Sequence, residues 1–101
     1  AKQAIAKAQA DSSASVRIAA ARAMARLGDS KSALVVLTEE LKGPYEWGRL
    51  AAAIALDEMD EQARPALPAL KAALKDQPNK YIVRVANRAI NELQGTEQQV
   101  P

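Results

Sequence analysis

Residues 11–41 read DSSASVRIAAARAMARLGDSKSALVVLTEEL, and this stretch decides the fold. Apolar residues recur in it at spacings of three and four on either side of Gly28-Asp29, which predicts two short helices joined by a tight turn. Its first half, RIAAARAMARL at 17–27, aligns with RLAAAIALDEM at 49–59, which lies 32 residues later. Its second half aligns with a later stretch at an offset of 33 through its leucines. Self-similarity at such a period is typical of a solenoid.

The internal repeat predicts one helical-repeat segment over residues 1–94, followed by a flexible tail at 95–101. We expect repeats at about 11–41 and 44–75, a partial repeat at 76–94, and an orphan second helix at 1–10. About six helices, arranged as antiparallel pairs, would then form an all-α fold, a right-handed α-α superhelix, because each pair exposes an apolar flank that only the next pair covers. The chain opens in mid-helix without an initiator Met, so we interpret it as a piece of a longer protein.

The composition favours close packing of thin helices over catalysis. Hydrophobic residues make up 49% of the 101 residues but aromatic residues only 3%, and alanine, the best helix former, supplies much of the apolar content. The absence of Cys and His removes most metal sites, thiol chemistry and the usual proton shuttle at neutral pH. Adjacent carboxylates such as Glu39 and Glu40 diverge by about 100° on a helix and do not make a catalytic pair. We therefore expect no catalytic residue, no cofactor and no metal.

Charge and hydropathy argue against two further classes of partner. The chain has 14 basic and 12 acidic residues, and this net charge of +2 is too small and too scattered for a nucleic-acid footprint. A small basic cluster of Arg22, Arg26 and Lys31 has no interleaved aromatic residues, so we interpret it as a solvated helix face. No apolar run approaches the roughly 20 residues that a transmembrane helix needs. We expect neither nucleic acid nor a membrane as a partner.

Helical periodicity predicts which side chains are buried. In a helix at about 14–27, the predicted core face comprises Val16, Ala20, Ala23, Met24 and Leu27. On the next helix, Glu39, Glu40 and Lys42 are expected to remain in water. Gly28 is predicted to end a helix in a left-handed conformation, and Gly95 is predicted to end the last helix. A further helix is predicted to open at Arg64-Pro65, since proline is tolerated in a first turn.

The two ends of the predicted stack are expected to expose apolar flanks. These flanks comprise Ile5 with Ala8 at one end and parts of the run 82–93 at the other. Such flanks predict self-association or end-to-end stacking of the chain.

The repeated pattern resembles that of a known family. Val16-Arg17-x-x-Ala20-Ala21-x-Ala23-Met24-x-x-Leu27-Gly28-Asp29 resembles the first helix of a HEAT repeat in its short bacterial form, and Ala66-Leu67-Pro68-Ala69-Leu70 resembles the second. The resemblance covers about residues 1–94 and implies a scaffold or a protein-interaction surface. Later copies depart from the pattern, because Gly48 replaces the leading Val and Arg84 aligns only after a slip of one residue.

A weaker resemblance concerns the run KYIVRVANRAINEL at 80–93, which is similar to the HEAT-like C-terminal region attached to some bacterial sulfatases. This resemblance implies a catalytic domain upstream, since the sulfatase signature, Cys or Ser followed by x-Pro-x-Arg, is absent here. It also implies a periplasmic or secreted protein. Without that attachment, the expectation is a cytoplasmic protein.

Arginines recur near the start of the first helix in each repeat, at Arg17, Arg49 and Arg84. One interpretation is a stripe that binds an acidic partner or a phosphate. The other is a structural ladder, in which each guanidinium bonds carbonyls or a carboxylate of a neighbouring turn.

Tyr45, Trp47 and Tyr81 precede or begin predicted helices. They could fill wider gaps in an alanine-rich core, or they could anchor a partner, since Trp and Tyr are favoured at protein interfaces. Trp47 is the preferred candidate for an external contact.

The sequence thus favours a non-catalytic module for protein–protein interaction or scaffolding. Its partner would be an upstream domain of the same protein or another chain. The alternative is the accessory C-terminal region of a sulfatase-like hydrolase. A nucleic-acid-binding repeat is disfavoured by Glu39 and Glu40, which stand where such a surface would need basic residues.

Overall fold

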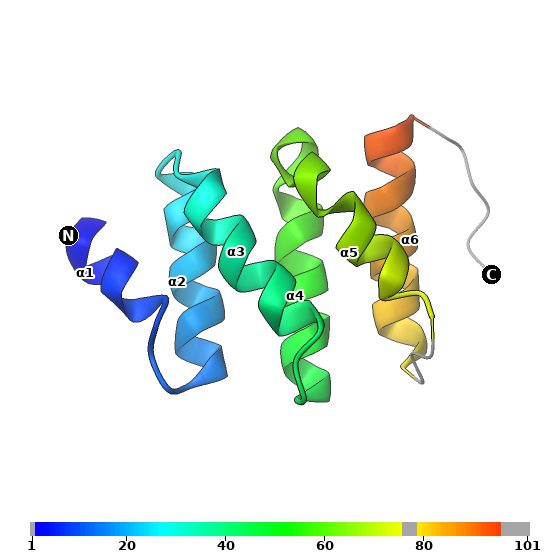
Figure 1. Cartoon of the computed structure of the whole chain (residues 1–101). Helices are drawn as coiled ribbons and strands as arrows, with labels where there is room; N and C mark the ends of the chain where they lie inside the picture. Colours follow the sequence, from blue (N-terminus) through cyan, green and yellow to red (C-terminus); the bar gives the residue numbers. More distant parts are fainter. Residues whose placement is uncertain (1, 76–78, 96–101) are drawn as a thin grey trace.

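The computed structural model describes residues 2–75 and 79–95, and this part of the chain consists of helices joined by short turns (Figure 1). Its elements, in order, are α1 (Lys2–Ala8), α2 (Ala14–Arg26), α3 (Ser30–Leu41), α4 (Glu46–Glu58), the 3₁₀-helix η1 (Asp60–Ala66), α5 (Leu67–Ala72) and α6 (Lys80–Gln94). The described residues contain six α-helices and no strand. The prediction of an all-α solenoid is therefore confirmed.

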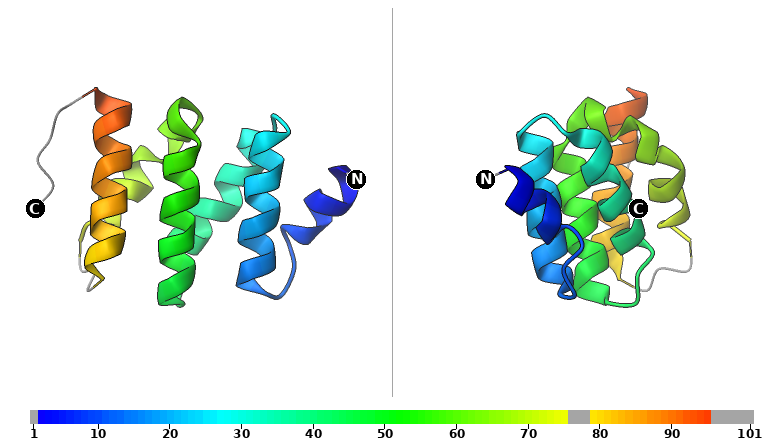
Figure 2. Two further views of the ribbon diagram at one scale, coloured as in Figure 1. Left: turned by 180° about the vertical axis from the view of Figure 1, so that it is seen from behind. Right: turned by 60° about the vertical axis from the view of Figure 1, so that its left-hand side comes forward.

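The helices form two layers. The longer first helices α2, α4 and α6 stand side by side and run in the same direction, and the shorter helices α1, α3 and α5 lie aslant against them (Figures 1 and 2). The principal-axis extents are 41 × 27 × 16 Å. The shortest extent matches two helix layers, because packed helices lie 8–10 Å apart.

Alanine makes this close packing available. The buried core of the first-helix layer includes Ala20, Ala21, Ala52, Ala53, Ala55, Ala86 and Ala89. The largest fully buried side chains are Met24, Leu37, Leu56, Leu70 and Ile82, which are distributed over α2 to α6. Small residues let the helix backbones approach, and one or two large side chains from each helix then fill the remaining space.

Each first helix ends at a residue with positive φ. Gly28 follows α2 with φ 96°, as predicted, and Gly95, predicted to end the last helix, follows α6 with φ 67°. After α4 the corresponding residue is Asp60, with φ 51°. Aspartate tolerates this region better than most residues because its short polar side chain bonds locally. The turn with positive φ therefore recurs after α4, although the residue there is aspartate and not glycine.

Helices α3 and α6 start with side-chain caps. Asp29 Oδ1 accepts a hydrogen bond of 3.1 Å from the Ser32 backbone N–H. Asn79 Oδ1 accepts from the backbone N–H groups of Tyr81 and Ile82 at 2.8 and 3.3 Å. Such caps satisfy the N–H groups that have no partner inside the helix.

The predicted core face of α2 is wrong at both of its ends. Val16 and Leu27 are 39% and 52% exposed, whereas Ile18 and Ala21 are buried instead. The reason is that α2 packs against α3 and α4 on one side but only against the short α1 on the other. A flank predicted to be buried is therefore only partly covered.

Two further predictions are corrected by the neighbouring helices. Glu40, expected to be in water, is buried, with 9% of its surface exposed. The helix expected to open at Arg64-Pro65 is instead the 3₁₀-helix η1 over residues 60–66, and α5 begins only at Leu67. Pro68 lies in the first turn of α5, where its missing N–H costs little.

The two ends of the stack differ in how fully their apolar residues are buried. Along α6 the buried residues are Ile82, Ala86, Ala89, Ile90 and Leu93, whereas Val83 and Val85 are half-buried. On α1 no residue is fully buried, and Ile5 and Ala8 are half-buried. Partly exposed apolar side chains are therefore present at both ends of the described stack. The predicted start of the partial repeat at residue 76 and most of the predicted tail, 96–101, lie outside the described residues.

We expect Leu37→Ala to lower the free energy of unfolding by about 2–5 kcal/mol, because Leu37 is fully buried between the two layers. The matched control is Val35→Ala on the same helix, where the side chain is 64% exposed, and its effect should stay within about 0.5 kcal/mol. Urea unfolding followed by circular dichroism measures both. Equal losses in the two variants would contradict the buried position of Leu37.

Candidate interaction surface

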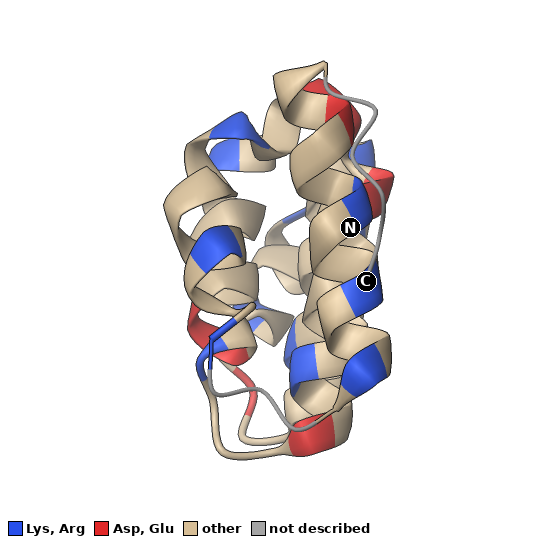
Figure 3. Cartoon of the chain, turned by 90° about the vertical axis from the view of Figure 1, so that its right-hand side faces the viewer, with Lys and Arg blue, Asp and Glu red and all other residues tan. Residues whose placement is uncertain are grey.

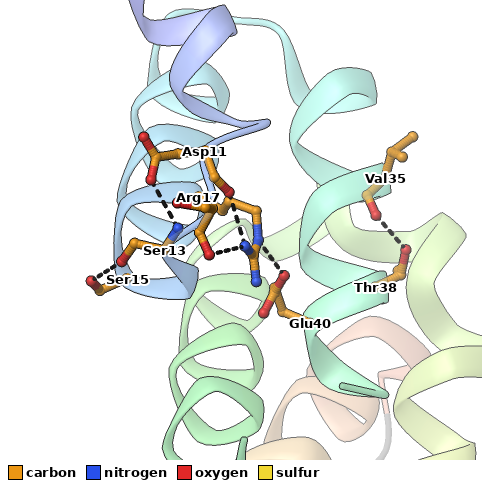
Figure 4. Close-up of polar contacts among 8 residues, drawn as sticks. Asp11, Ser13, Ser15, Arg17, Val35, Thr38 and Glu40 are labelled. Atoms are coloured by element: carbon orange, nitrogen blue, oxygen red, sulfur yellow. Dashed lines mark hydrogen bonds and ion pairs between the residues drawn. The ribbon is translucent and has the colours of Figure 1, made fainter. Parts of the chain in front are cut away.

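Arg17 joins three segments at the start of α2. Its Nε donates to Glu40 Oε2 on α3 at 2.7 Å, and its Nη1 donates to the carbonyl oxygens of Asp11 and Ser12 at 2.9 and 3.0 Å (Figure 4). The hydrogen bond to Glu40 is the main cause that raises the pKa of Arg17. The buried carboxylate of Glu40 thus has a cation beside it, as a buried charge requires.

Arg49 repeats part of this arrangement on α4. Its Nη1 donates to the Gly43 carbonyl oxygen at 2.9 Å, six residues earlier, as Arg17 does to Asp11. Both arginines are the fourth residue after the N-cap, Ser13 in α2 and Tyr45 in α4. Each guanidinium therefore ties its helix to the turn that leads into it.

Arg84 is not in the equivalent position. The N-cap of α6 is Asn79, so the fourth residue is Val83 and Arg84 is the fifth. One residue corresponds to a rotation of about 100° around the helix. Arg84 is exposed, and its side chain has no hydrogen bond or ion pair with any residue in the described ranges. Arg17 and Arg49 therefore occupy equivalent positions relative to their N-caps, and Arg84 does not.

Gly48, the third residue after the N-cap of α4, is buried beside Glu40. A Cβ at this glycine would lie 3.5 Å from Tyr45 Cβ and 3.8 Å from Glu40 Oε1, which are ordinary van der Waals distances. The repeat pattern thus changes from valine to glycine at the position that lies beside the side chain of Glu40.

The three aromatic side chains lie outside the core. Tyr45, Trp47 and Tyr81 are 56%, 53% and 58% exposed. Trp47 and Tyr81 are each the second residue after an N-cap, so they occupy equivalent places in the first turns of α4 and α6. Asn79 Nδ2 donates to Glu46 Oε2 at 3.1 Å, which holds these two first turns together. We refer to Tyr45, Trp47 and Tyr81 as the aromatic edge.

Two of the other arginines link neighbouring first helices. Arg22 on α2 donates through Nε and Nη2 to the two carboxylate oxygens of Glu58 on α4, at 3.0 and 2.8 Å. Arg88 on α6 donates through the same atoms to Asp57 Oδ2 on α4, at 2.9 and 2.6 Å. Arg22 therefore bridges two helices. This corrects the interpretation of the cluster of Arg22, Arg26 and Lys31 as a solvated helix face. Arg26 and Lys31 are exposed.

Four of the acidic residues pair with arginines. Glu40, Asp57 and Glu58 each pair with an arginine from another helix, and Glu61 pairs with Arg64 three residues later. Arg64 also donates from Nη2 to the Leu93 carbonyl oxygen at 2.6 Å, which ties η1 to the end of α6. Over the described ranges, no group of three or more Asp, Glu, His or Cys side chains is placed to hold a metal ion. Nor is any helix there long and apolar enough to cross a membrane.

Comparison with known proteins identifies one family. A family model described as HEAT repeats matches residues 1–91. No curated protein and no solved structure matches the chain. The family match accounts for the repeat pattern, and the weaker resemblance to the sulfatase-attached region gains no support from it.

A double-mutant cycle tests the coupling between Arg17 and Glu40. Each single substitution to alanine should lower the urea midpoint, and the double variant should lose less than the sum, because removing one partner leaves the other charge unpaired. The matched control is the Arg22–Glu58 cycle, since 46% of the Glu58 side chain is exposed against 10% for Glu40. The Arg17–Glu40 coupling should be the larger, because burial weakens solvent screening. A coupling no larger than the control would contradict the structural role of the pair.

The Glu61–Arg64 pair predicts a local pH dependence. The hydrogen bonds from Arg64 hold the pKa of Glu61 below its ordinary value of 4.5. The pair therefore stabilises the fold above about pH 4.5, and this contribution is lost as the pH falls through the lowered pKa. A carboxyl titration by NMR should show a Glu61 midpoint below 4.5 that moves up in Arg64→Gln. A midpoint that Arg64→Gln leaves in place would contradict the assignment.

Proposed function

Because this chain belongs to the HEAT-repeat family, we propose that it is a protein-interaction module whose aromatic edge contacts the partner. HEAT repeats form helical-repeat modules for protein interaction or scaffolding, and this family role supports the proposal. The observation that supports this particular surface is the exposure of three large aromatic side chains, each more than half exposed, in a chain with no other aromatic residue. An exposed Trp with flanking Tyr residues is the composition of an interface anchor.

The arrangement of these residues supports the proposal further. The aromatic edge lies at the N-terminal ends of α4 and α6, and the Asn79–Glu46 hydrogen bond sets the separation of those ends. Side chains in the first turn of a well-packed helix are presented by a rigid backbone. Such a surface loses little conformational entropy when a partner binds.

Basic residues follow the aromatic edge along α6, where Lys80, Arg84 and Arg88 recur every four residues and are exposed. Because Arg88 is paired with Asp57 and the exposed Glu46 lies between Tyr45 and Trp47, the basic character beside the edge rests on Lys80 and Arg84. Figure 3 looks onto this end of the stack and shows basic segments recurring along α6. Partners with acidic residues next to an apolar anchor would match this charge pattern. The partner is another chain or another domain of the same protein.

Attachment to a sulfatase-like hydrolase stays a prediction from the sequence at 80–93. No contact among the described residues favours it.

Affinity capture tests the aromatic edge. The chain is immobilised, proteins from an extract of the source cells are captured and identified, and the dissociation constant of the enriched protein is measured. Trp47→Ala should weaken binding roughly 30-fold or more, the effect of removing an interface hot spot. Tyr81→Ala should weaken binding in the same direction.

The matched control is Val35→Ala, which removes a 64% exposed apolar side chain from α3 in the other layer, where Figure 4 shows it pointing outward. This variant should bind as the unmodified chain does. Thermal unfolding of all variants establishes that they fold. Binding that survives both Trp47→Ala and Tyr81→Ala, or no enriched protein at all, would count against the proposal.

A further inference from the structure

A small pocket lies between the C-terminal ends of α2 and α4, which stand side by side in Figures 1 and 2. Its volume is about 260 Å³, and its polar lining consists of Arg22 and Arg26 of α2, Glu58 of α4 and Gln62 of η1. Trp47 lies in the first turn of α4, about 17 Å before Glu58 along the helix axis. The pocket is therefore separate from the aromatic edge, and a role for it does not depend on the function proposed above.

Arg26 brings an unpaired guanidinium to this pocket. Its side chain is exposed and has no hydrogen bond or ion pair with any residue in the ranges 2–75 and 79–95. A guanidinium carries five N–H donors in a planar fork, and all five are thus available to a ligand. Because Arg26 follows Arg22 by four residues, the two arginines lie on the same face of α2, with their Cβ atoms about 5–6 Å apart.

Glu58 orients the guanidinium of Arg22 and leaves one of its edges available. The bonds to Glu58 use Nε and Nη2 of Arg22, at 3.0 and 2.8 Å. Its Nη1 donates to no other residue of the described part of the chain. An acceptor group that enters the pocket therefore meets donors from both arginines, and one of the two is already held in position.

The rest of the pocket is apolar. Ala25, Ala55 and Met59 complete its lining, and Ala55 is fully buried while the other two are half-buried. A ligand group that ends in an acceptor on a short hydrocarbon stem would match both parts of this lining. Sites for drug-sized ligands enclose roughly 300–1,000 Å³, so this smaller volume suits one side chain better than a cofactor.

Charge favours a carboxylate over a phosphate in this pocket. The lining carries two arginines and one glutamate, which leaves one positive charge in excess. A carboxylate balances that excess, whereas a phosphate group carries about −1.5 to −2 charges at pH 7, and its additional charge would be repelled by Glu58. Asp60 and Glu61, which follow α4 in the chain, do not line the pocket, and Glu61 pairs with Arg64.

We propose that this pocket binds the side chain of a glutamate on a partner protein. Arg26 pairs with the carboxylate, Nη1 of Arg22 donates a further hydrogen bond to it, and the apolar lining contacts the two methylene groups of the glutamate stem. Arginine and carboxylate match each other in planar geometry, and a charge-assisted pair of this kind is stronger than a neutral hydrogen bond. Free glutamate fits less well, because the only carboxylate in the lining, Glu58, is already paired and does not serve the ammonium group.

Methyl NMR of the full 101-residue chain tests this site. The chain has two methionines, so a label on the methionine methyl groups gives one signal from Met59 in the pocket and one from Met24, which is buried in the core. The probe is glutamate blocked at its amino and α-carboxyl groups, so that the side-chain carboxylate is its only charge. The Met59 signal should shift and saturate at millimolar concentrations of the probe, and the Met24 signal should stay in place. A Met59 signal that does not move overturns the proposal.

Arg26→Gln should weaken binding of the blocked glutamate roughly 10-fold or more, because the variant lacks the unpaired charge. The matched control is Lys42→Gln, which removes the same charge at the C-cap of α3, an exposed position outside the pocket. This control should bind as the unmodified chain does. An unchanged Met24 signal shows that each variant keeps its core. No loss in Arg26→Gln, or an equal loss in the two variants, overturns the proposal.

Three further probes, compared at equal ionic strength, define the ligand. Blocked glutamine has nearly the same shape without the charge and should leave the Met59 signal in place. Free glutamate and inorganic phosphate should each bind more weakly than blocked glutamate. An equal shift with blocked glutamine, or tighter binding of free glutamate or phosphate, overturns the assignment to a glutamate side chain.

Discussion

The close contact between the alanine faces of α2, α4 and α6 is the constraint on which the rest of the structure depends. Alanine stands at the seventh and tenth positions after the N-cap in all three helices. In α4 and α6 these alanines are buried, and their small size lets each of these helices approach the first helix before it. Larger side chains at these positions would separate the first helices and open the layer of second helices that lies against them. The thin two-layer stack is thus a consequence of side-chain size more than of total hydrophobicity.

Arginine has two different roles in this stack. Arg17 and Arg49 are internal, since each bonds a carbonyl oxygen of the turn before its own helix, and Arg17 also compensates the buried Glu40. Arg22 and Arg88 connect neighbouring first helices through carboxylates of α4. Arg84 belongs to neither set, because a shift of one residue turns it outward. An arginine that recurs in each repeat therefore has the same role only where it also keeps the same position relative to the N-cap of its helix.

Membership of the HEAT-repeat family accounts for the repeated helix pairs of this chain. Glu40, Asp57, Glu58 and Glu61 pair with arginines, and the exposed aromatic residues Tyr45, Trp47 and Tyr81 stand at the N-terminal ends of α4 and α6. The two ends of the stack contrast as well, since the N-terminal end presents an apolar groove and α6 presents charge.

The sequence alone determined the helices, their turns and the solenoid, because these depend on local signals: apolar spacing, Gly28 and Gly95, and a pattern repeated after about one helix pair. It also indicated the aromatic residues and the doubtful register of Arg84. Only the tertiary structure decided that Glu40 is buried, that Val16 and Leu27 are exposed, and that residues 60–66 form a 3₁₀-helix. Periodicity identifies an apolar face on a helix, but the burial of each residue depends on which neighbour covers that face and how far the neighbour extends.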